Sequence, residues 1–168
     1  YKENAGIFCH NNTWIHLGWC QQGEGDRAYE YYLSICPAAK ENQIETYRCE
    51  PYVYAQMIAG RDAATPGEAK NAWLTGTAAW TFVTVSQGIF GIQPGFDGLR
   101  LDPCVPKAWP GFKVTRQYRG ATYDITVHNP NGASKGIQSL LVDGKEVPGN
   151  VLPLAPAGTT VKVEATLG

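Results

Sequence analysis

Residues 73–90 read WLTGTAAWTFVTVSQGIF, and this stretch decides how the first half of the chain is organised. From Thr77 onward the stretch contains no charged residue, and a helix that is apolar all round is normally buried on every side. Thr75 and Gly76 precede this predicted helix, so a hydroxyl and an unhindered glycine amide lie at its first turn. Free amides and the positive end of the helix dipole make such a start a candidate anion site. The structural alternative makes Thr75 an N-cap and Gly76 a packing residue.

The charge and hydropathy of the chain argue against two classes of partner. Its 168 residues include 14 basic and 15 acidic side chains, a net charge of −1, with no long run of either sign. This balance argues against nucleic acid and membrane surfaces as partners. No apolar run approaches the roughly 18 residues of a membrane helix, and no signal peptide opens the chain. Because the first residue is Tyr1 rather than Met, we expect the chain to be a piece of a longer protein.

The cysteines indicate a reducing compartment. The chain has five cysteines, an odd number, and no C-x-x-C pair. Scattered cysteines of this kind suit buried free thiols better than a disulfide framework or a zinc site. We therefore expect a cytoplasmic protein with no metal site.

Helical patterns dominate the first half. Asn11-Asn12-Thr13 offers good N-caps for an apolar helix over 14–20, and Asp26 is predicted to cap an amphipathic helix that ends at Cys36. A polar connection is expected over 38–48.

A third helix is predicted from Tyr52 to Ala59, because Pro51 suits its first turn and Gly60 suits its C-cap. A long loop over 61–71 leads to the apolar helix that starts at Thr77. Four such helices cannot bury their faces alone, which again indicates a fragment.

Strand patterns begin after Gly91. Apolar and polar residues alternate over 121–128, and the other strands are predicted at 99–101, 112–118 and 159–166. Arg119-Gly120 and Asp143-Gly144 are typical hairpin turns. The second half is therefore predicted to be an antiparallel β-sandwich.

Two helix starts form a possible pair, one after His10 and one after Thr75-Gly76. If they are neighbours, an imidazole, a hydroxyl and backbone amides converge on one point, which suits phosphate. Each helix end contributes about 0.3–1 kcal/mol to anion binding when exposed and up to about 2 kcal/mol when partly buried. The alternative for His10 is a purely structural histidine.

Four blocks of sequence resemble the C-terminal part of the inverting β-glucoside phosphorylases, the cellobiose phosphorylase-like enzymes of glycoside hydrolase family 94. The resemblance runs in order to about Val151, and the blocks are YKENAGIFCH (1–10), EPYVYAQ (50–56), WLTGTA (73–78) and GLRLDP (98–103).

The resemblance implies the end of an (α/α)6 catalytic barrel over 1–92 and a jelly-roll β-sandwich over 93–168. It implies phosphate-dependent, inverting cleavage of a β-linked, cellobiose-like disaccharide to α-glucose 1-phosphate and free sugar, with no cofactor. His10, Thr75 and Gly76 are implied to bind phosphate, and Lys2 to contribute to the acceptor-sugar subsite. The general acid, an aspartate, and a phosphate-binding arginine are expected upstream, so no catalytic residue is expected in this chain. The expected partners are the disaccharide, inorganic phosphate, the upstream segment of the enzyme and a second subunit in a homodimer.

Two other functions stay open at this point. A non-catalytic carbohydrate-binding β-sandwich with a helical appendage would not need phosphate. A hydrolase would need a carboxylate to activate water, whereas Asp26 and Glu50 are interpreted as structural. The tryptophans at 14, 19, 73 and 80 are interpreted as core residues, with sugar stacking as the alternative.

Overall fold

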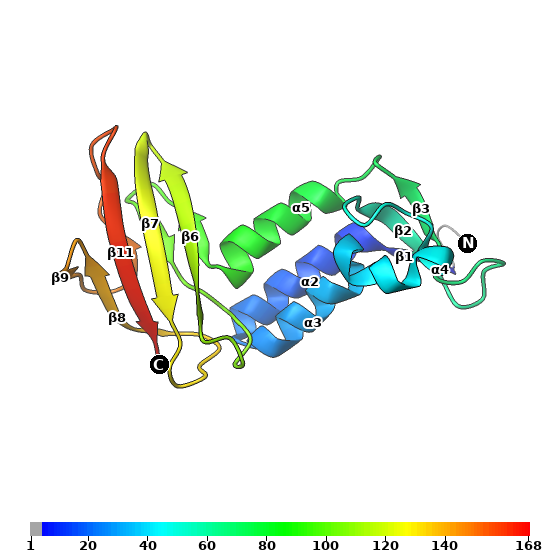
Figure 1. Cartoon of the computed structure of the whole chain (residues 1–168), viewed down its shortest axis with the longest axis horizontal. Helices are drawn as coiled ribbons and strands as arrows, with labels where there is room; N and C mark the ends of the chain where they lie inside the picture. Colours follow the sequence, from blue (N-terminus) through cyan, green and yellow to red (C-terminus); the bar gives the residue numbers. More distant parts are fainter. Residues whose placement is uncertain (1–4) are drawn as a thin grey trace.

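The chain forms an elongated molecule with helices and a small sheet at one end and strands at the other (Figure 1). The structure is a computed structural model, and it describes residues 5–168. The first part consists of β1 (Gly6–Phe8), α2 (Cys9–Gln22), α3 (Gly25–Ile35), the 3₁₀ helix η1 (Pro37–Gln43), α4 (Ile44–Tyr47), β2 (Ala55–Ala59), β3 (Ala69–Ala72), α5 (Thr77–Val83) and the π-helix η2 (Thr84–Ile89).

Helix α2 begins five residues before the predicted start at Trp14. Phe8 occupies the N-cap position, so the proposed caps at 11–13 lie inside the helix. Their side chains bond back to the preceding turn, since Asn12 Nδ2 donates to the Phe8 carbonyl oxygen at 2.8 Å. The early start follows from β1, because this paired strand leads straight into the helix at Cys9. Gly23, with φ +80°, ends the helix as expected.

Helix α3 packs against α2 and ends before Pro37 as predicted. Its N-cap position is Glu24, so the prediction that Asp26 caps this helix is wrong. The Asp26 carboxylate instead accepts a hydrogen bond from the Lys107 backbone N–H at 3.0 Å. Asp26 therefore joins the helical part to the strand part rather than capping its own helix.

The predicted helix from Tyr52 to Ala59 is a strand. Residues Ala55–Ala59 form β2, the middle strand of the small sheet β1-β2-β3. Alternate residues of β2 (Ala55, Met57 and Ala59) are buried, the period of a strand rather than of a helix. The expected loop over 61–71 likewise contains the beginning of β3. Gly60 is not a helix C-cap, because its N–H donates to the Ala5 carbonyl oxygen at 2.7 Å beside β1.

Helix α5 starts at Thr77 as predicted, but it is not buried on every side. The threonines at 77, 81 and 84 are buried, and the Thr84 hydroxyl lies 3.3 Å from the Thr13 carbonyl oxygen of α2. On other faces Trp80 is 41% exposed and Phe82 is 66% exposed. One face of this uncharged helix therefore packs on α2. Another face is apolar but exposed within residues 5–168.

The second part contains β4 (Ile92–Pro94), β5 (Leu99–Leu101), β6 (Gly111–Tyr118), β7 (Ala121–His128), β8 (Ile137–Val142), β9 (Lys145–Glu146), β10 (Val151–Leu152) and β11 (Thr160–Leu167). One sheet has the order β10-β5-β4 and the other β6-β7-β11-β8-β9. Strands β5, β6, β7 and β11 agree closely with the four predicted ranges, whereas β4, β8, β9 and β10 were not predicted. Both predicted hairpin turns are present, with positive φ at Arg119-Gly120 and Asp143-Gly144. The prediction of purely antiparallel pairing is wrong, because β11 pairs with β7 in parallel.

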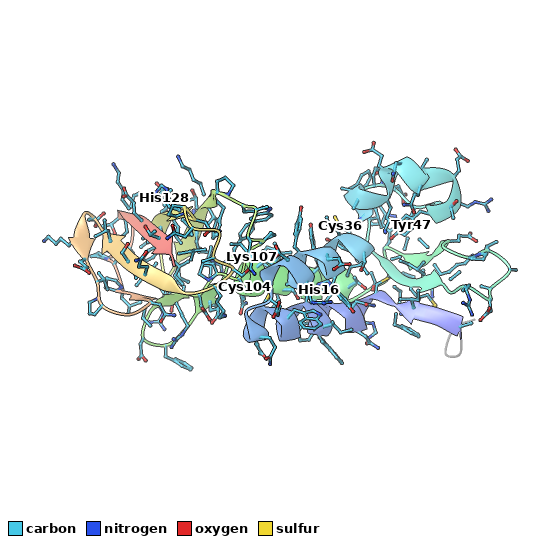
Figure 2. All side chains as sticks on the ribbon, turned by 90° about the horizontal axis from the view of Figure 1, so that it is seen from below. His16, Cys36, Tyr47, Cys104, Lys107 and His128 are labelled. Atoms are coloured by element: carbon cyan, nitrogen blue, oxygen red, sulfur yellow. The ribbon has the colours of Figure 1, made fainter. Side chains whose placement is uncertain are left out.

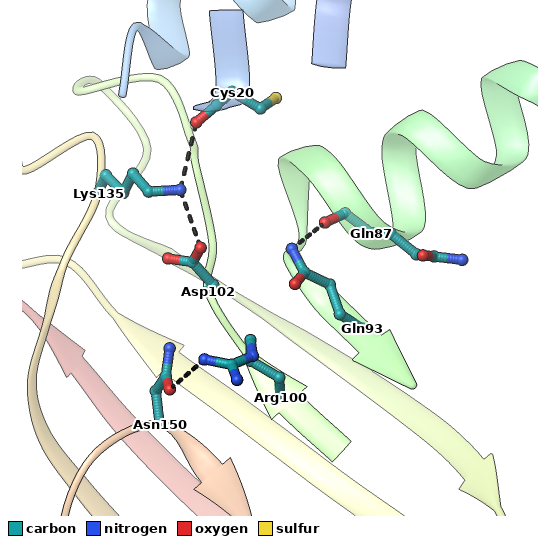
Figure 3. A network of polar contacts seen from close by, with 7 residues as sticks. All are labelled: Cys20, Gln87, Gln93, Arg100, Asp102, Lys135 and Asn150. Atoms are coloured by element: carbon teal, nitrogen blue, oxygen red, sulfur yellow. Dashed lines mark hydrogen bonds and ion pairs between the residues drawn. The ribbon is translucent and has the colours of Figure 1, made fainter. Parts of the chain in front are cut away.

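The two parts meet at a polar junction, which Figure 3 shows from close by. Lys135 Nζ donates to the Cys20 carbonyl oxygen of α2 at 3.2 Å and to Asp102 Oδ2 at 3.0 Å. Gln93 Nε2 donates to the Gln87 carbonyl oxygen of η2 at 2.9 Å. Figure 2 places Cys104 at the same junction, between the strands and the helix that carries His16. The helices are thereby anchored on the strand part at the C-terminal ends of α2 and η2.

Three chemical expectations concern the whole chain. All five cysteines are free and buried, as predicted. Within residues 5–168, no cluster of three or more His, Cys, Asp or Glu side chains is placed to hold a metal ion. None of the helices described is both long enough and apolar enough to cross a membrane.

Gly91 gives a test of the junction. It has φ +65°, and a Cβ atom there would collide with the Asp102 carbonyl group. Gly158 has φ +81°, but a Cβ atom there would meet no other atom within 4 Å, so it is the matched control. Both Gly→Ala changes cost about 1–2 kcal/mol for the left-handed backbone. Thermal unfolding of the intact protein should show a larger loss of stability for Gly91→Ala, and equal losses would contradict the close contact.

Candidate functional site

The small sheet brings two helix starts to one end of the molecule. Strands β1 and β3 are both antiparallel to β2, so they run in the same direction. Residues Phe8 and Ala72 end these strands, and the chain then enters α2 after β1 and α5 after β3. The two helices pack side by side and point away from the sheet together (Figure 1). Their N-terminal ends, and so the positive ends of their dipoles, therefore lie at the same edge.

Thr75 and Gly76 form a tightly bonded helix start. The Thr75 hydroxyl oxygen accepts a hydrogen bond from the Thr77 backbone N–H at 3.0 Å. The N-cap position itself belongs to Gly76, whose carbonyl oxygen accepts the first helical bond from the Trp80 N–H at 3.0 Å. The Thr77 hydroxyl, which is fully buried, donates to the Ala55 carbonyl oxygen at 3.1 Å. This last bond fixes the start of α5 on the middle strand of the sheet.

His10 lies in the first turn of α2 and is half-buried. Its imidazole contacts the Trp14 ring edge-on, with ring centroids 6.1 Å apart. The Trp14 ring in turn contacts Trp80 of α5 edge-on, with centroids 5.9 Å apart. Aromatic contacts therefore run from the first turn of α2 to the first turn of α5. The arrangement connects His10 to helix α5 through two tryptophan rings.

Two carboxylates considered from the sequence lie in different places. Asp26, at the start of α3, follows the C-terminal end of α2, and the 14 residues of α2 separate it from the two helix starts. At 1.5 Å per residue this helix is about 20 Å long. Glu50 lies much closer, because its Oε1 is 3.5 Å from Trp73 Nε1, two residues before Thr75. The pKa of Glu50 is lowered, mainly by a hydrogen bond from its own backbone N–H and also by the indole of Trp73.

The tryptophans only partly match their interpretation as core residues. Trp19 is half-buried against the strand core, whereas Trp14 is 55% exposed and Trp73 is 68% exposed. Tyr52, which is 73% exposed, contacts Trp73 edge-on with ring centroids 6.3 Å apart. The pairing of Tyr52 with Trp73 and Glu50 was missed by sequence reasoning. The only sequence signal for it was the position of Glu50 and Trp73 inside the matched blocks.

Buried titratable groups near the helix starts are held neutral. Cys9 directly precedes His10, and burial raises the pKa of its thiol to about 12. His16, about two turns further along α2, is fully buried, and burial lowers the pKa of its imidazole to about 4. Neither group supplies a charge at neutral pH. The Thr75 hydroxyl lies 2.7 Å from the Thr77 hydroxyl. Because the Thr77 hydroxyl donates to the Ala55 carbonyl oxygen, the Thr75 hydroxyl donates to Thr77 in this structure. Lys2 lies outside the residues that the structure describes.

These features define a mixed α and β protein with a candidate anion site at paired helix starts. Residues 1–91 match the family described as glycosyl hydrolase 94 superfamily, catalytic domain. Residues 96–134 match the family described as glycosyl hydrolase family 65, C-terminal domain. The chain belongs to the glycosyl hydrolase 94 superfamily, as the sequence blocks predicted.

Several characterised proteins are similar to almost the whole chain. An N,N'-diacetylchitobiose phosphorylase from Vibrio furnissii is 48% identical over 167 residues, 99% of this chain and 21% of that protein. A solabiose phosphorylase from Paenibacillus borealis is 38% identical over 165 residues, 98% of this chain and 22% of that protein. A 3-O-beta-D-glucopyranosyl-beta-D-glucuronide phosphorylase from the same organism is 31% identical over 152 residues, 90% of this chain and 20% of that protein. The chain therefore spans about a fifth of the length of these relatives.

Proposed function

We propose that this chain is part of an inverting disaccharide phosphorylase that uses inorganic phosphate to cleave a β-linked disaccharide. The observation that carries the proposal is the placement of two helix starts, with His10 and Thr75-Gly76, at one edge of the small sheet. An edge with two dipole ends and several donors suits a doubly charged oxyanion. Membership of the family and the phosphorylase relatives support the same reaction.

The proposed reaction assigns a role to each site residue. A phosphate oxygen forms a bond to the anomeric carbon on the face opposite the leaving sugar, so the configuration inverts. The glycosidic C–O bond breaks, its electron pair stays on the leaving oxygen, and a general acid protonates that oxygen. His10, Thr75 and Gly76 hold the phosphate, and Lys2 contributes to the acceptor-sugar subsite. The acid is an aspartate upstream of this chain, and no cofactor is needed because phosphate itself is the nucleophile.

The fold and partners follow from the same proposal. Residues 1–92 are the end of an (α/α)6 barrel, and residues 93–168 form a jelly-roll β-sandwich. The open faces of Trp14, Trp80 and Phe82 are then covered by upstream helices of the same barrel. The intact protein is proposed to be a cytoplasmic homodimer.

The relatives indicate which disaccharides to test first. Because their names include N,N'-diacetylchitobiose and solabiose phosphorylases, these two sugars join cellobiose in the first panel. Release of a sugar 1-phosphate by the intact protein, measured with and without phosphate, tests the reaction class directly. Cleavage that proceeds equally without phosphate would favour the hydrolase, for which Glu50 is the nearest candidate base.

A carbohydrate-binding module is the second candidate, and one observation favours it. Phe96 is 93% exposed on the loop between β4 and β5, beside a cavity of about 330 Å³ that Tyr118 and Arg119 also line. An exposed aromatic ring offers an apolar face for the C–H groups of a sugar, and a guanidinium offers hydrogen-bond donors for its hydroxyl groups. Sugar binding that needs no phosphate and no helical part would support this function instead.

Thr75→Val tests the phosphate site. The change preserves shape and removes the hydroxyl, whose proposed hydrogen bond to phosphate is worth roughly 1.5–3 kcal/mol, so the phosphate KM should rise about 10- to 100-fold. It also removes the bond that the hydroxyl accepts from the Thr77 N–H, so the melting temperature is measured alongside. Thr75→Ser keeps the hydroxyl that accepts from Thr77 N–H and should retain phosphate affinity. An unchanged phosphate KM in Thr75→Val would refute the assignment.

His10→Asn tests whether the histidine acts on phosphate or on folding. The half-buried side chain has room for asparagine, so the melting temperature should change little while phosphorolysis falls. Thermal unfolding and steady-state kinetics are measured on the same preparation. A lower melting temperature with an unchanged phosphate KM would establish the structural role instead.

The isolated 168-residue chain should be inactive. A positioned general acid contributes about 10²–10⁴-fold to such a reaction, and the proposed aspartate is not among these residues. Activity should appear when the upstream segment is supplied covalently or as a separate polypeptide. Phosphorolysis by the isolated chain would overturn the assignment of the acid to the upstream segment.

A further inference from the structure

Three side chains form a small exposed cluster beside the proposed phosphate site. The Tyr52 and Trp73 rings meet edge to face with centroids 6.3 Å apart and are 73% and 68% exposed. The Glu50 carboxylate contacts the indole, with Oε1 at 3.5 Å from Trp73 Nε1. The cluster therefore presents two apolar ring surfaces and an ionised hydrogen-bond acceptor together.

The backbone holds Trp73 in a costly conformation. Its φ is +70°, in the left-handed region that bulky residues rarely adopt, and Asn71 two residues earlier has φ +51°. Such a conformation persists only when the surroundings fix it. Two bonds do so on either side of Trp73: Asn71 Nδ2 donates to Gln56 Oε1 at 2.8 Å, and Thr77 Oγ1 donates to the Ala55 carbonyl oxygen at 3.1 Å. The segment from β3 to α5 is thus tied to β2 at both ends, and the indole projects outward between them.

The distance to the reacting atoms is short. A nucleophilic phosphate oxygen must lie about 3–3.5 Å from the anomeric carbon before reaction. Trp73 is two residues from Thr75, a separation of at most about 7 Å along the backbone. An indole side chain is comparable in length to this separation, so under the proposed function a sugar ring bonded through that carbon would meet the Trp73 ring.

We propose that Trp73, together with Tyr52 and Glu50, forms a contact surface for a pyranose ring of the disaccharide. The rings pack against the C–H face of the sugar, and Glu50 accepts hydrogen bonds from its hydroxyl groups. This cluster is too small for a protein partner, since stable protein interfaces use about 20–30 residues a side. The inference rests on the proposed function, because it places the sugar relative to the phosphate held by Thr75.

The test is steady-state kinetics of the intact protein with the best disaccharide of the panel. Trp73→Ala should raise the KM for the disaccharide by about 10-fold while the KM for phosphate stays within about twofold. Trp73→Phe keeps an aromatic face and should recover most of this loss. Leu154→Ala, which truncates an exposed apolar residue on the strand part, is the control and should leave both KM values unchanged.

The possible outcomes separate the two proposals. Absence of phosphate-dependent cleavage in the wild type would refute the proposed function. Phosphate-dependent cleavage with an unchanged disaccharide KM in Trp73→Ala would refute only the sugar contact, and so would an equal rise in both KM values. If Trp73→Ala does not fold, Tyr52→Ala, which removes a more exposed ring, decides by the same comparison.

Discussion

Strand β2 pairs with β1 on one side and with β3 on the other, and both neighbours run toward the same edge before they enter a helix. The Thr77 hydroxyl adds a bond from the start of α5 to the Ala55 carbonyl oxygen of β2. Because these contacts set the strand ends, they also set where His10 and Thr75-Gly76 lie. The candidate site thus depends on backbone pairing in a sheet of three short strands. A register shift in β2 would separate the helix starts without altering either helix.

Sequence reasoning succeeded where local signals decide the structure. The hairpin at Arg119-Gly120 follows from turn chemistry, and the strand over 121–128 follows from period-two alternation. It failed at residues 52–59, where Pro51 and Gly60 bracket a short apolar run that fits a helix equally well. Pairing with β1, which lies about 50 residues earlier in the chain, decided that segment. No local pattern carries information about such a partner.

The residues of the candidate site could be predicted from the sequence, but their arrangement in space could not. The blocks around His10 and Thr75 identified the residues, because the family match rests on sequence. That the two helix starts share one edge of the sheet could be stated only as a condition. Their placement depends on β2, which the sequence analysis predicted to be a helix. The cluster of Tyr52 and Trp73 was invisible for the same reason, because it forms where the chain enters β2 and leaves β3. Exposure of these rings also ran against the usual burial of large aromatic residues.

The two parts of the chain differ in how completely they bury their apolar residues, and this difference bears on function. Inward-facing residues such as Tyr123, Leu101 and Leu140 are almost fully buried in the strand part, and their core continues into the near ends of the helices. Away from that shared core, the helical part has a small separate cluster of Tyr47, Cys49 and Val53. Its side chains Trp14, Trp80 and Phe82 stay exposed. Exposed apolar surface of that extent costs solubility unless something covers it. The strand part thus acts as a stable anchor, through Lys135 and Asp102, for a helical part whose open faces suit completion by further helices. Under the proposed function the phosphate lies beside these exposed faces, and anything that covers them also lowers the local dielectric and strengthens the hydrogen bonds to phosphate.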